Sequence, residues 1–287
     1  MNLTSFFTQH FGGASFYHSH SETPDAKRFE RHCHNNYELI YVVKGKGKYV
    51  VESAEYPLLP NTVLLLRPYE YHYVCPQSDS AYERYVFHFS SNLFLDAADR
   101  LEMTNQNKTG SAGIYFSDDQ TTPTVLAQLQ MLNETLSSRP SALTEQPSRA
   151  ETLLRITINQ ILILLSYLRA DAPEDAENEW IAKVIRYLGN HMNEDISLEE
   201  MARHFFVSKY HLCHTFRNHT GTSIFSYLTT KRIALAQQYL VEGMPANDAA
   251  DRVGFHDYSV FYRAYRKITG ESPSQTRGEA KRAGRRL

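Results

Sequence analysis

The chain has 287 residues, of which 42% are hydrophobic and 22% charged; this is the composition of a folded globular protein and excludes long-range disorder. At roughly 150 residues per domain, the length predicts about two domains. No apolar run approaches the ~20 residues that span a bilayer, and the N-terminal residues resemble no signal peptide. The three cysteines are scattered without C-x-x-C spacing. We therefore expect a protein of the reducing cytoplasm, with no membrane partner and no zinc finger.

The net charge of −2 hides an uneven distribution along the chain. Residues 1–179 contain 14 basic and 22 acidic side chains, a net charge of −8. Residues 180–287 contain 16 basic and 10 acidic side chains, a net charge of +6. A basic region attracts a polyanion such as DNA, whereas an acidic region repels it. The two halves are therefore expected to have different functions.

Residues 1–122 are predicted to form a β-domain. Segments rich in β-branched and aromatic residues, separated by turn residues, predict strands at 37–43, 48–53, 62–67 and 82–89. Short strands at close spacing favour a sandwich or a small barrel over a parallel sheet. The polar stretch 104–113 is predicted to be a loop.

Residues 123–170 change to a helical period. Apolar residues recur every three or four positions from Val125 to Leu136 and from Leu154 to Leu168. Two interpretations of this helical pair are open: it covers the open end of a barrel, or it forms a dimer through a coiled-coil seam. We assign it as a dimerisation segment. The acidic run 171–179 is predicted to be a linker to the next domain.

Residues 196–221 predict two short helices joined by a tight turn. Ser197 and Glu200 have the spacing of a capping box at the start of the first helix. The second helix starts at Ser208, and Gly221 is expected to end it as a C-terminal cap. This arrangement is typical of a helix-turn-helix unit.

The same pattern recurs further along the chain. Gly221 corresponds to Gly270 at an offset of 49, and Ala202 corresponds to Ala250 at an offset of 48, so one residue is inserted in the second turn. A long helix over residues 223–242 is predicted to join the two copies. Two such units on a basic segment indicate DNA binding.

Residues 181–278 resemble the DNA-binding domain of the AraC/XylS transcriptional regulators. The resemblance rests on SLEEMARHFFVSKYHLCHTFRNHTG in the first unit, RIALAQQYL in the joining helix and VGFHDYSVFYRAYRKITGESPSQTR in the second unit. It implies a DNA-binding domain at 180–278 with a basic tail at 279–287. It also implies double-stranded promoter or operator DNA and RNA polymerase as partners.

By that resemblance, the base-facing positions lie on the second helix of each unit: Tyr210, Cys213, His214, Tyr258, Ser259, Tyr262 and Arg263. They are placed opposite apolar positions of the same helices, such as Leu212 and Phe261. An arginine such as Arg263 can bind O6 and N7 of a guanine or clamp a phosphate. Further basic residues are expected to contact the DNA backbone: Lys209, Arg217, Arg266 and Lys267.

A second motif lies in the predicted β-domain. His32, His34, Glu38 and Gly45 follow the order H-x-H-x3-E-x6-G, and His72 comes later. Alternation along a strand places His32, His34 and Glu38 on one face. The spacing resembles the cupin family, and AraC-type regulators commonly keep a cupin barrel as a sensing domain. The implied fold is an α+β two-domain protein: a cupin-like β-barrel with a helical pair, followed by an all-α double helix-turn-helix domain.

Three roles for these histidines are open: binding an organic ligand, binding a divalent metal ion, or a structural role at the barrel rim. Three imidazoles and a carboxylate suit a divalent ion. Tyr69, however, stands where the cupin motif has glycine, and we therefore expect no metal and no cofactor. A polar, aromatic interior suits a sugar. The expected ligand-binding residues are His32, His34, Glu38, Arg67 and His72.

The leading hypothesis is a one-component transcriptional regulator that is not an enzyme. The barrel senses a small molecule, the helical pair forms a homodimer and the helix-turn-helix units bind DNA. Activation is expected because it is the commoner mode in the family, and the expected location is the bacterial cytoplasm at the nucleoid. The alternative is a metal-dependent cupin enzyme with a helical appendage, which leaves the duplicated basic unit without a purpose.

Overall fold

The computed structural model describes residues 4–11, 14–24, 29, 31–52, 54–90, 93–94, 114–138, 147–168, 171, 179–241 and 243–277. The chain divides into two compact units, residues 1–177 and 178–287, and each is described by itself. The predicted loop at 104–113, most of the predicted linker and the predicted basic tail lie outside the described residues. Within the described part, no helix is long and apolar enough to cross a membrane.

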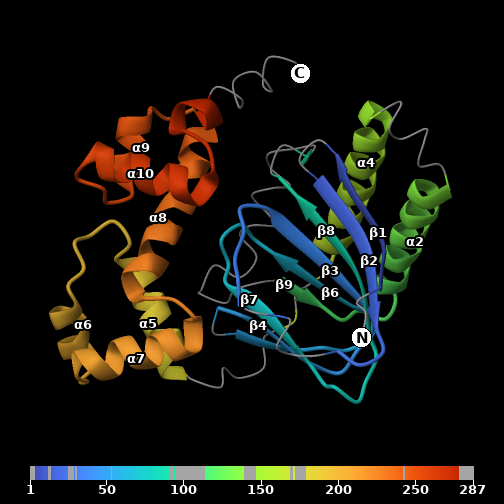
Figure 1. The fold of residues 1–287 in the computed structure, drawn as a ribbon, viewed down its shortest axis with the longest axis horizontal. Coiled ribbons are helices and arrows are strands. Elements are labelled where there is room, and N and C mark those ends of the chain that lie inside the picture. The colour runs from blue at the N-terminus through green and yellow to red at the C-terminus, as the bar shows by residue number, and fades with distance from the viewer. Residues whose placement is uncertain are drawn as a thin grey trace. The chain divides into compact units, whose positions relative to one another are not determined.

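The N-terminal unit is rich in β-structure (Figure 1). The four strands predicted from the sequence are confirmed as β3 (Tyr37–Lys44), β4 (Gly47–Val51), β6 (Thr62–Leu66) and β8 (Tyr82–Phe89). Five further strands were not predicted: β1 (Thr4–Phe11), β2 (Ala14–Ser21), β5 (Ala54–Pro57), β7 (His72–Pro76) and β9 (Ile114–Phe116). Serines and histidines interrupt the aromatic alternation of β1 and β2, and β5, β7 and β9 are short, so their sequence signals are weak.

The strands form two facing sheets. One has the order β1-β2-β8-β3-β6-β9 and the other the order β5-β4-β7. The fold is thus the predicted cupin-like one, although the described strands are hydrogen-bonded in two sheets rather than in one closed barrel. Apolar side chains from both sheets pack between them, among them Ile40 and Leu64 from the large sheet and Val51 and Val74 from the small sheet.

Strand β3 shows how the layers are arranged. Leu39 and Tyr41 pack on one face with the helices, whereas Ile40 and Val42 pack on the other face with the small sheet. Because both faces are covered, every residue from Tyr37 to Val42 is buried. By alternation, Glu38 leaves the strand on the side of the small sheet.

Helices α2 (Thr122–Ser138) and α4 (Pro147–Ser166) pack on the outer face of the large sheet. Their buried residues recur at the predicted spacing, as with Leu129 and Leu132 in α2 and Ile158 and Ile161 in α4. The interpretation that the pair covers an open end of the barrel is wrong, because these side chains share one core with the face of the sheet, including Leu39 and Phe87.

The described secondary-structure elements of the C-terminal unit are all helices, as predicted. Its helices are α5 (Glu179–Asn190), α6 (Leu198–His204), α7 (Lys209–Thr220), α8 (Ile224–Val241), α9 (Ala246–Arg252) and α10 (Tyr258–Thr269). The Ser197 side chain accepts a hydrogen bond from the Glu200 amide, and Ser208 does the same for the His211 amide. These N-caps begin α6 and α7 where the sequence predicted.

The duplication is visible in the backbone hydrogen bonds. Before the turn the offset is 48: the Val207 amide donates to Ala202 O and the Phe255 amide to Ala250 O. After the turn the offset is 49: the amides of Gly221 and Gly270 donate to Arg217 O and Arg266 O. His256, between Phe255 and the N-cap Asp257, is therefore the inserted residue.

Candidate functional site

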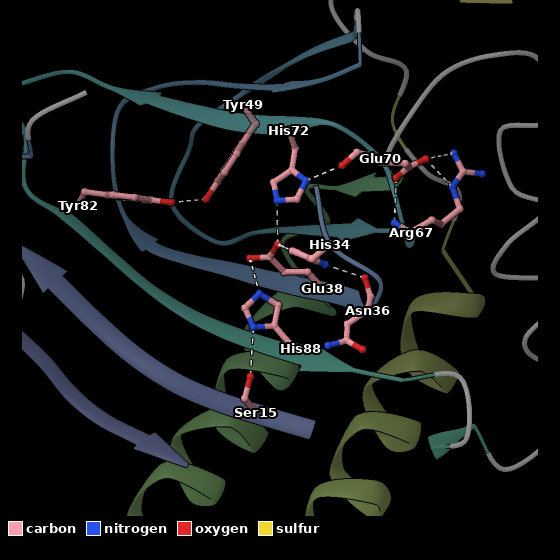
Figure 2. Close-up of polar contacts among 10 residues, drawn as sticks. All are labelled: Ser15, His34, Asn36, Glu38, Tyr49, Arg67, Glu70, His72, Tyr82 and His88. Atoms are coloured by element: carbon pink, nitrogen blue, oxygen red, sulfur yellow. Dashed lines mark hydrogen bonds and ion pairs between the residues drawn. The ribbon is translucent and has the colours of Figure 1, made fainter. Parts of the chain in front are cut away.

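A buried carboxylate of the N-terminal unit is surrounded by three imidazoles (Figure 2). Glu38 Oε2 lies 2.9 Å from His34 Nε2 and 3.1 Å from His72 Nε2. Glu38 Oε1 lies 3.3 Å from His88 Nε2. The side chains of Glu38 and His72 are buried, and those of His34 and His88 are half-buried. Three imidazoles, from the segment before β3, from β7 and from β8, therefore surround the Glu38 carboxylate.

Strand pairing brings these side chains together. Glu38 and His88 are directly opposite one another in the β3–β8 pair, so their side chains leave the sheet on the same face. His72 begins β7 of the facing sheet. Ser15 is opposite His88 in the β2–β8 pair, and its hydroxyl lies 3.2 Å from His88 Nδ1. The cluster is thus built by both sheets and by three strands of the larger one.

The contacts of Nδ1 determine which ring nitrogen of His34 and of His72 carries a hydrogen. His34 Nδ1 lies 3.0 Å from the Asn36 carbonyl oxygen, and His72 Nδ1 lies 2.8 Å from the Glu70 carbonyl oxygen. A carbonyl oxygen only accepts, so both Nδ1 atoms must carry a hydrogen and donate it. In both rings it is therefore Nε2 that faces Glu38.

The electrostatics of the cluster favour charge separation. Burial by itself raises the pKa of a carboxyl group, but hydrogen bonds from His34, His72 and His88 outweigh it and hold the pKa of Glu38 well below its ordinary value. Burial likewise lowers the pKa of an imidazole, but the hydrogen bond and charge of Glu38 outweigh it and raise the pKa of His72. Glu38 is therefore ionised at neutral pH.

An arginine and several tyrosines lie near the carboxylate. Arg84 is hydrogen-bonded to Tyr17 and Tyr82, and its guanidinium carbon lies 4.6 Å from the centroid of the Tyr82 ring. The Tyr82 hydroxyl is also hydrogen-bonded to the Tyr49 hydroxyl. Burial is the main cause that raises the pKa of Tyr17 to about 12, so its hydroxyl stays neutral. This region offers cationic, neutral and anionic hydrogen-bonding groups to a small polar ligand.

In the C-terminal unit, α7 and α10 carry the residues expected to face DNA. Leu212 and Phe216 of α7, and Phe261 and Tyr265 of α10, are buried. The expected contact residues lie on the other sides of these helices. Nine of them are exposed: Lys209, Tyr210, His214, Arg217, Tyr258, Ser259, Arg263, Arg266 and Lys267. Two are half-buried: Cys213 and Tyr262.

Some of the α7 side chains already have neighbours. The rings of Tyr210 and His214 are stacked, with centroids 5.5 Å apart and planes inclined by 6°. Asn218 Nδ2 donates to His214 Nε2 at 3.0 Å. Lys209 forms an ion pair with Glu199 of α6. To contact DNA, Lys209 must share or give up that partner.

Two family models match the chain where these two sites lie. The model of the AraC-like ligand binding domain matches residues 16–155, and that of a helix-turn-helix domain matches residues 201–279. The chain belongs to the AraC/XylS family of transcriptional regulators. The recognition helices α7 and α10 lie within the second match, and the Glu38 cluster lies within the first.

Transcriptional regulators from several bacteria match most of this chain. The uncharacterized HTH-type transcriptional regulator YbfI of Bacillus subtilis is 28% identical over 237 residues, 81% of each chain. The HTH-type transcriptional activator RhaS of an Enterobacter species is 25% identical over 252 residues, 87% of each chain. The arabinose operon regulatory protein of Escherichia coli is 24% identical over 249 residues, 84% of this chain and 80% of its own. These relatives are transcriptional regulators, and this chain is one with a ligand-binding and a DNA-binding domain.

In this AraC/XylS regulator, the structure brings together four of the five residues expected to bind the effector. His34 and His72 contact Glu38, and ring nitrogens of His32, His34 and His72 lie within 4.8 Å of one another. His32 is exposed, and its ring centroid lies 4.4 Å from that of His72. Arg67 is directed to Glu70, with 2.7 Å between Arg67 Nε and Glu70 Oε1 (Figure 2). It therefore lies beside the Glu38 cluster rather than in it.

Sequence analysis missed His88 and Arg84, which line the same region. Both lie on the predicted strand 82–89, and the signal that reveals them is alternation. Tyr82 and Val86 belong to the core between the two sheets, so Arg84 and His88 leave β8 on that side. The period of two along residues 82–89 therefore predicts that both side chains face the small sheet.

Proposed function

We propose that this regulator activates transcription in response to a sugar or a related polyhydroxylated metabolite bound near Glu38. The observation that carries the proposal is the buried group of carboxylate, imidazole, guanidinium and phenol side chains. Sugar hydroxyls need paired donors and acceptors, and sugar C–H faces pack on aromatic rings. The relatives support this direction, since one is named for the arabinose operon and another as an activator.

In this proposal the effector contacts His34, Glu38 and His72 directly. Arg84 and Tyr17 supply further hydrogen bonds from the same side of the large sheet. The other two expected residues, His32 and Arg67, contribute at the edge of the site.

The proposed DNA interface consists of α7 and α10, each in the major groove of promoter DNA. Bases are contacted by Tyr210, Cys213, His214, Tyr258, Ser259, Tyr262 and Arg263, and phosphates by Lys209, Arg217, Arg266 and Lys267. Two recognition helices joined by one helix suit neighbouring major-groove segments about one helical turn, roughly 34 Å, apart. RNA polymerase is the proposed partner at the promoter.

A homodimer is proposed through α4. Ile156 and Ile163 are 48% and 44% exposed, and Tyr167 just beyond the helix end is 85% exposed. Spacings of seven and four residues place them on one stripe, which is the spacing of a coiled-coil seam. Ile156→Glu combined with Ile163→Glu is expected to make the full-length protein monomeric in light scattering. Because the side chains of Ile156 and Ile163 lie outside the core, the two substitutions are expected to leave the fold intact.

The effector is tested by thermal unfolding of the full-length protein with a panel of sugars. A binder present at 100 times its Kd adds about 2.7 kcal/mol to the free energy of unfolding. Glu38→Gln is expected to abolish this gain. Glu55→Gln is the control, because Glu55 forms an ion pair with Lys48 on the small sheet. No gain with any sugar, or an equal gain in Glu38→Gln, contradicts a sugar effector at this site.

The DNA contacts are tested at matched positions of the two units. Arg263 of α10 and His214 of α7 correspond at the offset of 49. Arg263→Ala is expected to weaken specific binding by about 1–3 kcal/mol, because an arginine can bind a guanine through two hydrogen bonds. His214→Ala is expected to cost less, because Asn218 already occupies its Nε2. Titration with promoter DNA and with random DNA measures the affinities. An equal loss of affinity of Arg263→Ala for both DNAs assigns Arg263 to a phosphate contact. No loss of affinity for either DNA contradicts the proposed interface.

A further inference from the structure

We infer that the effector is a monocarboxylic sugar acid whose carboxylate binds to Arg84, Ser19 and Tyr17. This inference rests on the proposed sugar site near Glu38 and names the class of sugar. The three residues lie on strands β2 and β8 of the large sheet. Together they offer a positive charge and hydrogen-bond donors, the combination that binds a carboxylate most strongly.

Strand register places these side chains together between the two sheets. Ser19 of β2 is directly opposite Arg84 of β8, so both side chains leave the sheet on the same face. Tyr82 and Val86 of β8 belong to the core between the sheets, and alternation places Arg84 on that side with them. Tyr17 lies two residues before Ser19 on β2 and therefore shares the face.

Arg84 is a cation that forms no ion pair with a carboxylate among the described residues. It is hydrogen-bonded to the hydroxyls of Tyr17 and Tyr82, and the Glu38 carboxylate contacts three imidazoles instead. A guanidinium stays protonated in proteins, and a charge withdrawn from water without a counter-ion is costly. A carboxylate on the ligand supplies that counter-ion.

Ser19 gives an independent indication of a ligand. Its side chain is buried, and its Oγ atom has no hydrogen-bond partner in the part of the chain that the structure describes. A buried hydroxyl without a partner is costly. A ligand oxygen beside Arg84 accepts a hydrogen bond from this hydroxyl and removes the cost.

The hydrogens around Arg84 favour an anion over a neutral sugar hydroxyl. A guanidinium only donates, so the oxygen of Tyr17 accepts from it, and the Tyr17 hydroxyl keeps its own hydrogen for a ligand. Arg84, Ser19 and Tyr17 thus offer donors, which match the two acceptor oxygens of a carboxylate. A phosphate carries about −1.5 to −2 charges and fits a single guanidinium less well, since residues 1–179 already have a net charge of −8.

Tyr17 connects this group with the Glu38 cluster. Its ring centroid lies 5.9 Å from that of His88, which contacts Glu38. After burial, the charge of Glu38 is a further cause that raises the pKa of Tyr17. One sugar acid can therefore place its carboxylate at Arg84 and its hydroxyls at Glu38.

Calorimetric titration of the full-length protein tests the inference with matched pairs: galacturonate with galactose, glucuronate with glucose, and gluconate with glucitol. In at least one pair we expect the acid to bind about tenfold to a hundredfold more tightly, as for a hydrogen bond to a charged group. The 6-phosphates of galactose and glucose are expected to bind more weakly than the acids.

The outcomes separate this inference from the proposed function. A neutral sugar that binds as tightly as its acid overturns the inference and leaves the sugar effector intact. A phosphate that binds more tightly than the acids also overturns it. No binding by any of these compounds contradicts both the inference and the proposed function.

Matched variants locate the carboxylate. Arg84→Gln is expected to lower the affinity for the acid to that for the neutral sugar. Lys48→Gln is the control, because it removes a positive charge of the same unit that is paired with Glu55 on the small sheet. If Arg84→Gln fails to unfold cooperatively, Ser19→Ala decides, and it should weaken binding of the acid about threefold to tenfold. An unchanged preference for the acid in Arg84→Gln, or an unchanged affinity in Ser19→Ala, overturns the inference.

Discussion

The two helix-turn-helix units share one hydrogen-bonded frame but differ in what their turns contact. In the second unit the turn residue is Gly254, with φ of +85°. A Cβ atom there would lie 2.8 Å from the carbonyl oxygen of Asn193. In the first unit the corresponding residue is Phe206, with φ of +54° and a side chain that is 96% exposed. The motif sets the turn conformation, whereas the surroundings decide which residue can adopt it.

The loop after α5 explains this difference. His256 Nε2 lies 3.1 Å from Asp195 Oδ1, and Arg232 of α8 donates from Nε to the Met192 carbonyl at 2.7 Å. Together with the close approach of Asn193 to Gly254, these contacts pack the loop on the second turn. The exposed Phe206 shows that the first turn lacks such close packing around its residue.

The largest effects on stability are expected in the cores of the two helix-turn-helix units. Phe261 of α10 and Leu212 of α7 correspond at the offset of 49, and both are fully buried. Phe261→Ala is expected to lower the free energy of unfolding by about 3–5 kcal/mol, and Leu212→Ala by about 2–5 kcal/mol. Denaturant unfolding measures both. Val260→Ala, on the exposed side of α10, should change stability by under about 0.5 kcal/mol; an equal loss there contradicts the assignment of the core.

The second turn should not tolerate a side chain. Gly254→Ala combines a left-handed φ with a contact to the Asn193 backbone, and we expect it to cost about 2–3 kcal/mol of unfolding free energy. Phe206→Ala at the matched position serves as the control, because no packing is lost from a side chain in solvent. A cost under about 0.5 kcal/mol for Gly254→Ala would show that the loop moves away easily.

The first turn should gain from glycine. A non-glycine residue in the left-handed region costs roughly 1–2 kcal/mol, and glycine loses roughly 0.5–1 kcal/mol in chain entropy. Phe206→Gly is therefore expected to raise the free energy of unfolding by about 0.5–1 kcal/mol. DNA titration of the same variant sharpens the comparison, because a more stable protein with weaker binding assigns Phe206 to the interface. A loss of stability contradicts the strain argument.

The smallest expected effect is a difference in the pH dependence of stability between the N-caps Asp257 of α10 and Ser208 of α7. Hydrogen bonds from the amides of Val260 and Ser259 hold the pKa of Asp257 below its ordinary value of 3.8. A carboxyl group with a lowered folded pKa stabilises fully above its unfolded pKa and loses this contribution as the pH falls through the folded pKa. The stability difference between the unaltered protein and Asp257→Ala should therefore shrink on acidification.

The matched cap on α7 does not titrate. Ser208 accepts one hydrogen bond from the His211 amide, so the effect of Ser208→Ala should stay constant over the same pH range. Denaturant unfolding of both variants between about pH 5 and pH 3 makes the comparison. If the losses of stability in Asp257→Ala and Ser208→Ala change with pH in the same way, the charge of Asp257 has no role in capping.

Local signals predicted most of the C-terminal unit. The caps Ser197 and Ser208 and the glycines that end α7 and α10 are recognised from neighbouring residues, and the insertion from a comparison of the two copies. Among the described strands of the N-terminal unit, the same approach found four and missed five, because β-pairing depends on partners distant in sequence. His34, Glu38 and His72 were found through a motif, whereas His88 belonged to no motif.

The sequence by itself determined that this chain carries a duplicated basic helix-turn-helix unit behind a β-domain, because caps, helical period and charge are encoded between near neighbours. Only the tertiary structure decided which side chains surround Glu38. The register of β3 on β8 places His88 opposite it, and the facing sheet brings His72 to the same carboxylate. Tertiary packing also decided that Gly254 must be glycine while Phe206 need not be. Alternation along β8 gives the face on which His88 lies, but the residue it meets depends on the register with β3, which only the folded backbone reveals.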